Sequence, residues 1–87
     1  MSSLPIFLIG GAGPRAPMEF ALLIAALSPT RPVIPMDMVV FHGGPPAIDF
    51  SLATETSVLL DKMDQMGANS GHLIGYSGGA AVALAFA

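Results

Sequence analysis

Apolar residues occur in short blocks along this chain, and glycine and proline separate the blocks. The first block, Ile6-Phe7-Leu8-Ile9, is continuous and lies between a proline and a glycine. A run that is apolar at every position is typical of a buried parallel strand, whereas a half-exposed strand alternates. We therefore predict a strand over residues 6–9, a loop over residues 10–17 where glycine and proline are frequent, and a short helix over residues 18–27.

A second strand is predicted around Val33 and Ile34, with Met36 beyond them. Proline cannot donate to a sheet ladder and fits poorly inside a strand, so we expect the ordered pairing to lie on either side of Pro35. The strand could extend over residues 38–41, which are again apolar.

The clearest periodicity lies in residues 51–66. Side chains recur there at spacings of 4, 3, 4 and 3, which places them along one face of a helix. The members of this face are Leu52, Thr56, Leu59, Met63 and Met66. Asp49 or Ser51 can cap the start of such a helix, and Gly67 suits the left-handed position after its end. We predict an amphipathic helix that packs Leu52, Leu59 and Met63 onto a sheet.

A third apolar run, His72-Leu73-Ile74, is followed by an alanine-rich segment over residues 80–87. Strand and helix therefore alternate three times, without an internal repeat or a linker. Such alternation predicts an α/β domain whose strands are parallel and are joined by right-handed crossovers. We expect residues 1–87 to belong to one domain, with the first two strands flanking or adjoining the third.

The composition is apolar, since 53% of the residues are hydrophobic and 10% are charged. A domain of this size rarely keeps so much apolar surface in water, so we expect the remainder of a larger domain or a partner chain to cover part of it. We therefore predict that the chain does not form a stable monomer by itself.

Charge and hydropathy exclude several partners. The net charge of -3 offers no basic patch for nucleic acid. No uncharged apolar run is long enough to span a membrane, and the first residues lack the basic segment of a secretory signal, so we expect a cytoplasmic protein without a membrane partner. The sequence contains no cysteine, which excludes disulfides and thiolate metal sites.

One pentapeptide, Gly75-Tyr76-Ser77-Gly78-Gly79, lies where the third apolar run gives way to the alanine-rich segment. A strand that turns into a helix within one residue strains the backbone there, and flanking side chains would clash, which glycine at 75 and 79 avoids. Such a turn would expose the Ser77 hydroxyl. It would also aim the first N–H groups of the helix, that of Gly78 foremost, at charge developing beside the serine. The motif therefore predicts a nucleophile and half of an oxyanion hole.

Four segments together resemble the first half of an α/β-hydrolase domain. They are the loop Leu8-Ile9-Gly10-Gly11-Ala12-Gly13, the strand Val33-Ile34-Pro35-Met36-Asp37, the helix over residues 51–66 and the run His72-Leu73-Ile74-Gly75-Tyr76-Ser77-Gly78-Gly79. G-x-S-x-G between a strand and a helix is the nucleophile elbow of that family. The resemblance implies a three-layer αβα fold with parallel central strands, of which residues 1–87 would be the N-terminal part. It also implies a serine hydrolase of esters or thioesters, with no cofactor and no metal.

The resemblance also assigns site residues. Ser77 would be the nucleophile, and the N–H groups of Gly78 and of Gly11, or of Ala12 in place of Gly11, would form the oxyanion hole. The family usually has a His-Gly pair where this chain has Ile9-Gly10, a departure that leaves the main-chain donors in place. The triad acid and histidine would lie beyond residue 87. Because an unactivated serine hydroxyl is a poor nucleophile, we expect the 87 residues alone to be inactive or nearly so.

Two other functions remain open. Gly11-Ala12-Gly13-Pro14-Arg15-Ala16 fits G-x-G-x-x-A after a strand, and Asp37 ends the next strand, as in a nucleotide-binding βαβ module. Against that reading, the spacing from Gly11 to Asp37 exceeds the usual separation of about twenty residues, and Pro14 and Pro17 interrupt the helix that should receive the pyrophosphate. The chain could also be a non-catalytic, hydrolase-like scaffold that keeps the elbow as architecture.

Both histidines precede Ser77, whereas the triad histidine of the family follows its serine. His72 would open the third strand, a strand's length from Ser77. His42 would lie in the loop after the second strand, where it could line a pocket, although a loop histidine in water is favoured over a catalytic one. Asp37 resembles an aspartate that is normally structural in the family.

Overall fold

The computed structural model describes residues 4–42 and 51–87, which form an α/β structure with one parallel sheet. The strands are β1 (Ile6–Ile9), β2 (Val33–Met36) and β3 (His72–Gly75). The helices are α1 (Ala16–Glu19), α2 (Ala21–Leu27), α3 (Val39–His42), α4 (Leu52–Met66) and α5 (Gly78–Phe86). Strands and helices thus alternate along the chain as the sequence predicts.

The strand order is β2-β1-β3, and both pairings are parallel, as expected. Ile9 is level with Met36 on one side and with Gly75 on the other, so the carboxyl ends of the three strands meet at one edge of the sheet. The expectation that β2 could adjoin β3 is wrong, because β1 lies between them. The four residues of β1 are all buried, as the continuous apolar run predicts and as its central position in the sheet requires.

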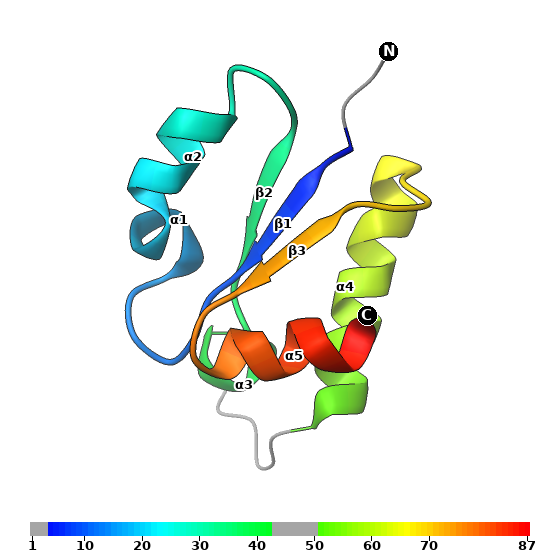
Figure 1. Ribbon diagram of the computed structural model, residues 1–87. Helices are drawn as coiled ribbons and strands as arrows, with labels where there is room; N and C mark the ends of the chain where they lie inside the picture. The colour runs from blue at the N-terminus through cyan, green and yellow to red at the C-terminus, as the bar shows by residue number, and fades with distance from the viewer. Residues whose placement is uncertain (1–3, 43–50) are drawn as a thin grey trace.

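Helices cover both faces of the sheet, and each covered face has its own cluster of buried side chains (Figure 1). On one face, Phe7 and Ile9 pack with residues of α4 and α5, including Leu59 and Val82. On the other face, Ile6 and Leu8 pack with α1 and α2. The alternation of β1 side chains between the two clusters follows from the two-residue repeat of a strand.

Pro35 lies inside β2, paired with Leu8, rather than between two separately paired segments as we expected. The hydrogen bonds explain why the strand tolerates it. The carbonyl oxygens of Pro32 and Met36 accept from the N–H groups of Ile6 and Gly10, so the alternating main-chain groups of Val33 and Pro35 face away from β1. Among the described strands β2 is at the edge of the sheet, and there the missing N–H of proline interrupts no ladder.

The segment after β1 is more helical than predicted. The expected loop over residues 10–17 ends early because α1 begins at Ala16, with Pro17 in the first turn, where a proline costs no hydrogen bond. The predicted helix over residues 18–27 is divided at Phe20, whose φ of -105° and ψ of 19° leave the helical region. The Phe20 side chain is buried in the cluster of β1, α1 and α2, so tertiary packing fixes this break.

The extension of the second strand over residues 38–41 is also wrong, since Val39–His42 forms α3. A side chain from α4 accounts for the difference. The carboxylate of Glu55 accepts hydrogen bonds from the N–H groups of Val39 at 2.8 Å and of Val40 at 3.1 Å. The first N–H groups of a helix have no carbonyl partner within the helix. Because they point toward the space before the helix, a carboxylate at that position is stabilising.

The long helix α4 has the predicted bounds and caps. The Ser51 hydroxyl accepts from Thr54 N–H at 3.2 Å, and Gly67 follows the helix with a left-handed φ of 68°. Asp49, the other candidate cap, lies outside the described residues. Leu59 and Met63 are buried as expected, but Leu52 is 39% exposed, and the third buried position is Glu55. None of the described helices is long and apolar enough to cross a membrane.

Candidate active site

The strand-to-helix turn at Ser77 has the backbone geometry that the glycine-flanked motif predicts. β3 ends at Gly75 and α5 begins at Gly78, so two residues complete the reversal. Ser77 has φ 55° and ψ -120°, and among the described residues it is the one non-glycine residue with a positive φ. Such a conformation costs on the order of 1–3 kcal/mol and persists only where the surroundings impose it. Its side chain makes no capping hydrogen bond to α5 and lies exposed.

Three main-chain hydrogen bonds hold this turn. The N–H of Tyr76 donates to the carbonyl of Ile9 at 3.0 Å, which extends the pairing of β3 with β1 to the residue before the serine. The N–H groups of Gly79 and Ala80 donate to the carbonyls of Tyr76 and Ser77, each at 3.0 Å, and close the first turn of α5. The strained serine is therefore fixed from both sides.

Gly75 and Gly79 are needed because α5 passes close to the ends of two strands. A Cβ on Gly75 would overlap the carbonyl oxygen of Gly79 and lie 2.6 Å from the Ala80 Cα. A Cβ on Gly79 would overlap the carbonyl oxygen of Ile9 and lie 2.7 Å from that of Gly10. All these atoms belong to the backbone, so they cannot rotate away as a side chain would. The roles predicted for both glycines of the elbow are thus visible in the packing.

The loop after β1 lies against the serine, although the two are far apart in sequence. A Cβ on Gly11 would lie 3.1 Å from the Ser77 Cβ and 3.5 Å from the Gly78 nitrogen. Gly11 is buried and Ala12 is exposed. Gly11, one of the two residues proposed from sequence as second donor, therefore lies close to Ser77 and Gly78.

Two main-chain donors remain available in this region. Gly78 is the first residue of α5, where an N–H has no carbonyl partner within the helix. Within the described part of the chain, no hydrogen bond uses the N–H of Gly78 or of Gly11. A partial positive charge at the helix start adds to the attraction for an anion. Two unused main-chain donors near an exposed hydroxyl are what an oxyanion hole requires.

Asp37, which directly follows β2, binds the C-terminal end of the same loop. One of its carboxylate oxygens accepts from the Ala16 N–H at 2.6 Å, and the other lies 3.7 Å from a guanidinium nitrogen of Arg15. Asp37 thereby caps α1 and fixes the far end of the segment that carries Gly11. A carboxylate engaged in this way is poorly placed to receive a ribose hydroxyl, which weighs against the nucleotide-binding interpretation. The residue type alone does not show this cap, because its partner is a main-chain group 21 residues away.

Among the side chains that the structure describes, which do not include that of His42, no histidine or carboxylate hydrogen-bonds to Ser77. His72 is the first residue of β3 and lies exposed at the amino end of the sheet, a strand's length from Ser77, as predicted. His42 ends α3, and its side chain lies outside what the structure describes. No group of three or more metal-binding side chains occurs in the described part of the chain.

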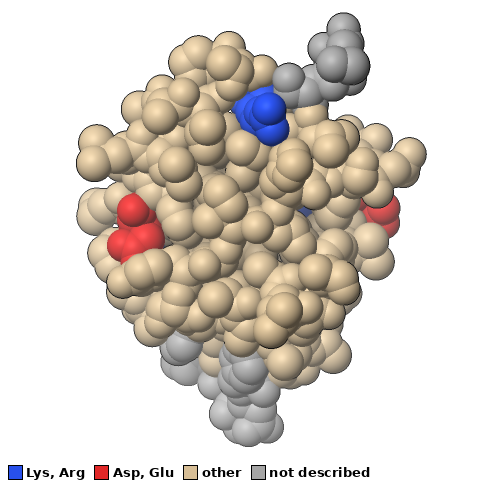
Figure 2. All heavy atoms as spheres, viewed as in Figure 1, with Lys and Arg blue, Asp and Glu red and all other residues tan. Residues whose placement is uncertain are grey.

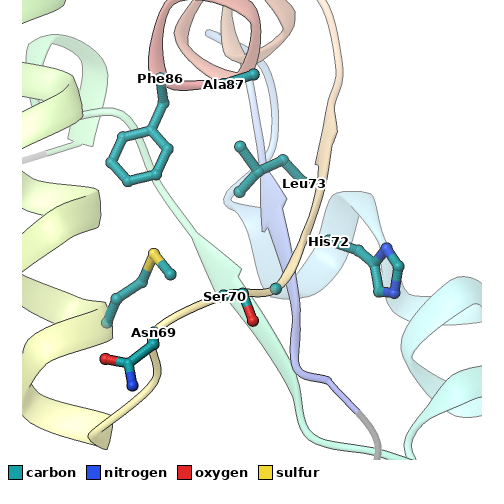
Figure 3. Close-up of a pocket in the computed structure, with 8 residues that line it drawn as sticks. Asn69, Ser70, His72, Leu73, Phe86 and Ala87 are labelled. Carbon is teal, nitrogen blue, oxygen red and sulfur yellow. The ribbon is translucent and has the colours of Figure 1, made fainter.

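A hollow of about 500 Å³ lies away from the serine, at the amino end of β3. It is lined by Met63, residues 69–73, Phe86 and Ala87. Figure 3 shows Phe86 and Leu73 facing this hollow, whereas the ring of His72 projects to the other side of the strand. Because neither Ser77 nor Gly11 contributes to its lining, we do not assign substrate binding to it. No family model, curated protein or solved structure matches the chain.

Proposed function

We propose that this chain carries the nucleophile and the oxyanion hole of a serine hydrolase of the α/β-hydrolase type. One observation carries the proposal: Ser77 is held at a positive φ between β3 and α5, with the buried Gly11 beside it. Strain of this kind is retained at functional sites more often than in ordinary turns. A strand-turn-helix setting for G-x-S-x-G supports the nucleophile elbow in particular.

The proposed reaction is acyl transfer. The Ser77 oxygen attacks the carbonyl carbon of an ester or thioester while a general base takes its proton. The carbonyl oxygen becomes an oxyanion, which the N–H groups of Gly78 and Gly11 stabilise. Collapse of this intermediate expels the alcohol or thiol and leaves an acyl-serine, which water then hydrolyses.

The base and its orienting acid belong, in this proposal, to residues outside the described part of the chain or to another chain. The geometry accounts for this assignment, because the carboxylates of Asp37 and Glu55 already bind main-chain N–H groups and His72 lies at the other end of the sheet. The proposal extends to the fold: the sheet with helices on both faces would be the N-terminal part of a three-layer αβα hydrolase domain.

A fluorophosphonate probe tests the nucleophile on the chain as it stands. We expect one slow addition, detected by intact-protein mass spectrometry and mapped by peptide sequencing to Ser77. The reaction is slow because no described base takes the proton, but it is selective because the helix start and Gly11 stabilise the negative charge that develops on the phosphoryl oxygen. Ser77→Ala should abolish the addition and keep the fold, because alanine preserves every main-chain contact of the turn.

Ser57→Ala is the matched control, since Ser57 is an exposed serine on α4 and away from the turn. It should label as the parent does, and unfolding the parent in urea should remove the selectivity for Ser77. If Ser77→Ala is labelled as fast as the parent, or if the label spreads over several serines, the turn is architecture only and the chain is a non-catalytic scaffold.

A further inference from the structure

The loop between β1 and α1 closes on itself, and both of its ends are tied to the end of β2. Its first residue, Gly10, lies against Ala16, because a Cβ on Gly10 would be 3.4 Å from the Ala16 Cβ. The Gly10 N–H donates to the carbonyl of Met36 at 3.0 Å. At the other end, the Asp37 carboxylate accepts from the Ala16 N–H at 2.6 Å. Two consecutive residues, Met36 and Asp37, therefore hold the two ends of the loop that contains Gly11.

The peptide between Gly10 and Gly11 is the part of this loop whose orientation matters for the proposed oxyanion hole. A Cβ on Gly79 would lie 2.7 Å from the Gly10 carbonyl oxygen, so this carbonyl lies beside the first turn of α5. None of the described peptide bonds is cis, so the Gly11 N–H points to the opposite side of the peptide. A peptide between two glycines has no Cβ on either side to resist rotation. The contacts that hold the loop must therefore fix the direction of the Gly11 N–H.

We propose that Asp37 is a positioning residue for the second oxyanion donor. Its hydrogen bond to the Ala16 N–H holds the loop so that the Gly11 N–H serves an oxyanion formed at Ser77. Without this anchor the loop is held at the Met36 end alone, and the peptide between the two glycines is free to rotate. This inference rests on the proposed function, in which the N–H groups of Gly11 and of the helix start bind the oxyanion together.

Of the two contacts described for the Asp37 carboxylate, the hydrogen bond to Ala16 is the one that holds the loop. Ala16 is fully buried and the Asp37 side chain is 22% exposed, so water competes little for this hydrogen bond. The Arg15 side chain is 64% exposed, and its nitrogen lies 3.7 Å from the carboxylate, where an ion pair in water holds its partners weakly. An amide at position 37, which keeps the acceptor oxygen and loses the charge, should therefore preserve the position of the loop.

The rate at which a fluorophosphonate adds to Ser77 measures the effect. Asp37→Ala removes the acceptor, and we expect the addition to be about 10- to 100-fold slower, a smaller loss than deletion of an oxyanion donor causes, because a displaced donor still contributes. Asp37→Asn should label within about threefold of the parent, since asparagine and aspartate are comparable as caps. An Asp37→Ala variant that labels as fast as the parent, or an Asp37→Asn variant that labels as slowly as Asp37→Ala, would overturn the proposal.

Asp61→Ala is the matched control for the loss of a negative charge. In the view of Figure 2 the surface is almost wholly uncharged, so the removal of any one carboxylate changes the field of the molecule. Asp61 is exposed on α4, away from the loop, and Asp61→Ala should label as the parent does. All variants are compared well below the melting temperature of the least stable one, so that a difference in rate does not reflect unfolding.

Amide NMR of the phosphonylated chain separates positioning from a general loss of structure. An N–H that donates to the phosphoryl oxygen moves downfield, so in the parent the signals of both Gly11 and Gly78 should move on phosphonylation. In phosphonylated Asp37→Ala the shift at Gly78 should remain and the shift at Gly11 should be lost. Equal shifts at Gly11 in the two proteins would overturn the role of Asp37 and leave the proposed function intact. A parent adduct that moves neither signal would contradict the oxyanion hole itself, and this inference with it.

Discussion

The close approach of α5 to β1 makes Gly79 the most sensitive position of the turn. In a Gly79→Ala variant the added methyl group would overlap the Ile9 carbonyl oxygen and lie 2.6 Å from the carbonyl carbon of that residue. These atoms belong to a fully paired central strand, so α5 must move instead. The helix start, with the Gly78 N–H, would move with it.

The expected cost follows from this overlap. Overpacking of a rigid site costs about 1–3 kcal/mol of folding free energy. Because the added methyl group would meet backbone atoms, we expect the cost of Gly79→Ala to lie toward the upper end of that range. Alanine favours a helix over glycine by up to about 1 kcal/mol, which offsets part of the cost. We expect a net loss of about 2 kcal/mol, which corresponds to a fall of roughly 8–16 °C in the melting temperature.

Gly13→Ala is the matched control, because a Cβ there would meet no atom within 4 Å and the residue has no positive φ. Thermal unfolding followed by circular dichroism, at one protein concentration for both variants and the parent, measures the difference. Gly13→Ala should be as stable as the parent or slightly more so, through reduced freedom of the unfolded chain. If Gly79→Ala is as stable as Gly13→Ala, then α5 does not pass against β1 as described.

Three further substitutions test separate features. Ser77→Gly should stabilise the chain by about 1 kcal/mol in urea titration, because glycine adopts a positive φ without strain, whereas Ser77→Ala should leave the stability unchanged. Glu55→Gln should destabilise by about 1 kcal/mol and speed hydrogen exchange at Val39 and Val40, because an amide leaves one of these two part-buried donors unpaired. Asp37→Ala should cost about 1 kcal/mol by removing the cap at Ala16, and unchanged unfolding would show that this hydrogen bond is dispensable.

Local sequence patterns predicted the elements that local rules determine. The continuous run of β1, the caps of α4 and the glycine-flanked serine each depend on residues that are neighbours along the chain. The periodicity of α4 identified Leu59 and Met63 as buried, since helical spacing alone places them on one face.

Long-range contacts decided what the sequence could not show. A glutamate on a helix is ordinarily assigned to the solvated face, yet Glu55 is 5% exposed because α3 supplies two main-chain donors for its carboxylate. The same contact makes Val39–His42 helical, although its apolar residues favour a strand. Leu52 follows the apolar spacing but remains half-covered, because burial depends on which elements lie opposite each turn of α4.

The candidate site likewise has one part that local sequence predicts and one part that depends on long-range contacts. The turn at Ser77 and the need for Gly75 and Gly79 could be predicted from five consecutive residues. The approach of Gly11 could not be predicted from spacing, because it depends on the pairing of β1 with β3, which brings two segments 66 residues apart to one end of the sheet. It was expected only from the resemblance to α/β-hydrolases.

The most direct test of the central claim is a crystal structure of the chain after phosphonylation at Ser77. The account predicts that the phosphoryl oxygen lies about 2.7–3.1 Å from the nitrogens of both Gly78 and Gly11, as an oxyanion would. An adduct on Ser77 whose oxygen points into solvent, with neither N–H within hydrogen-bonding distance, would contradict the proposed oxyanion hole.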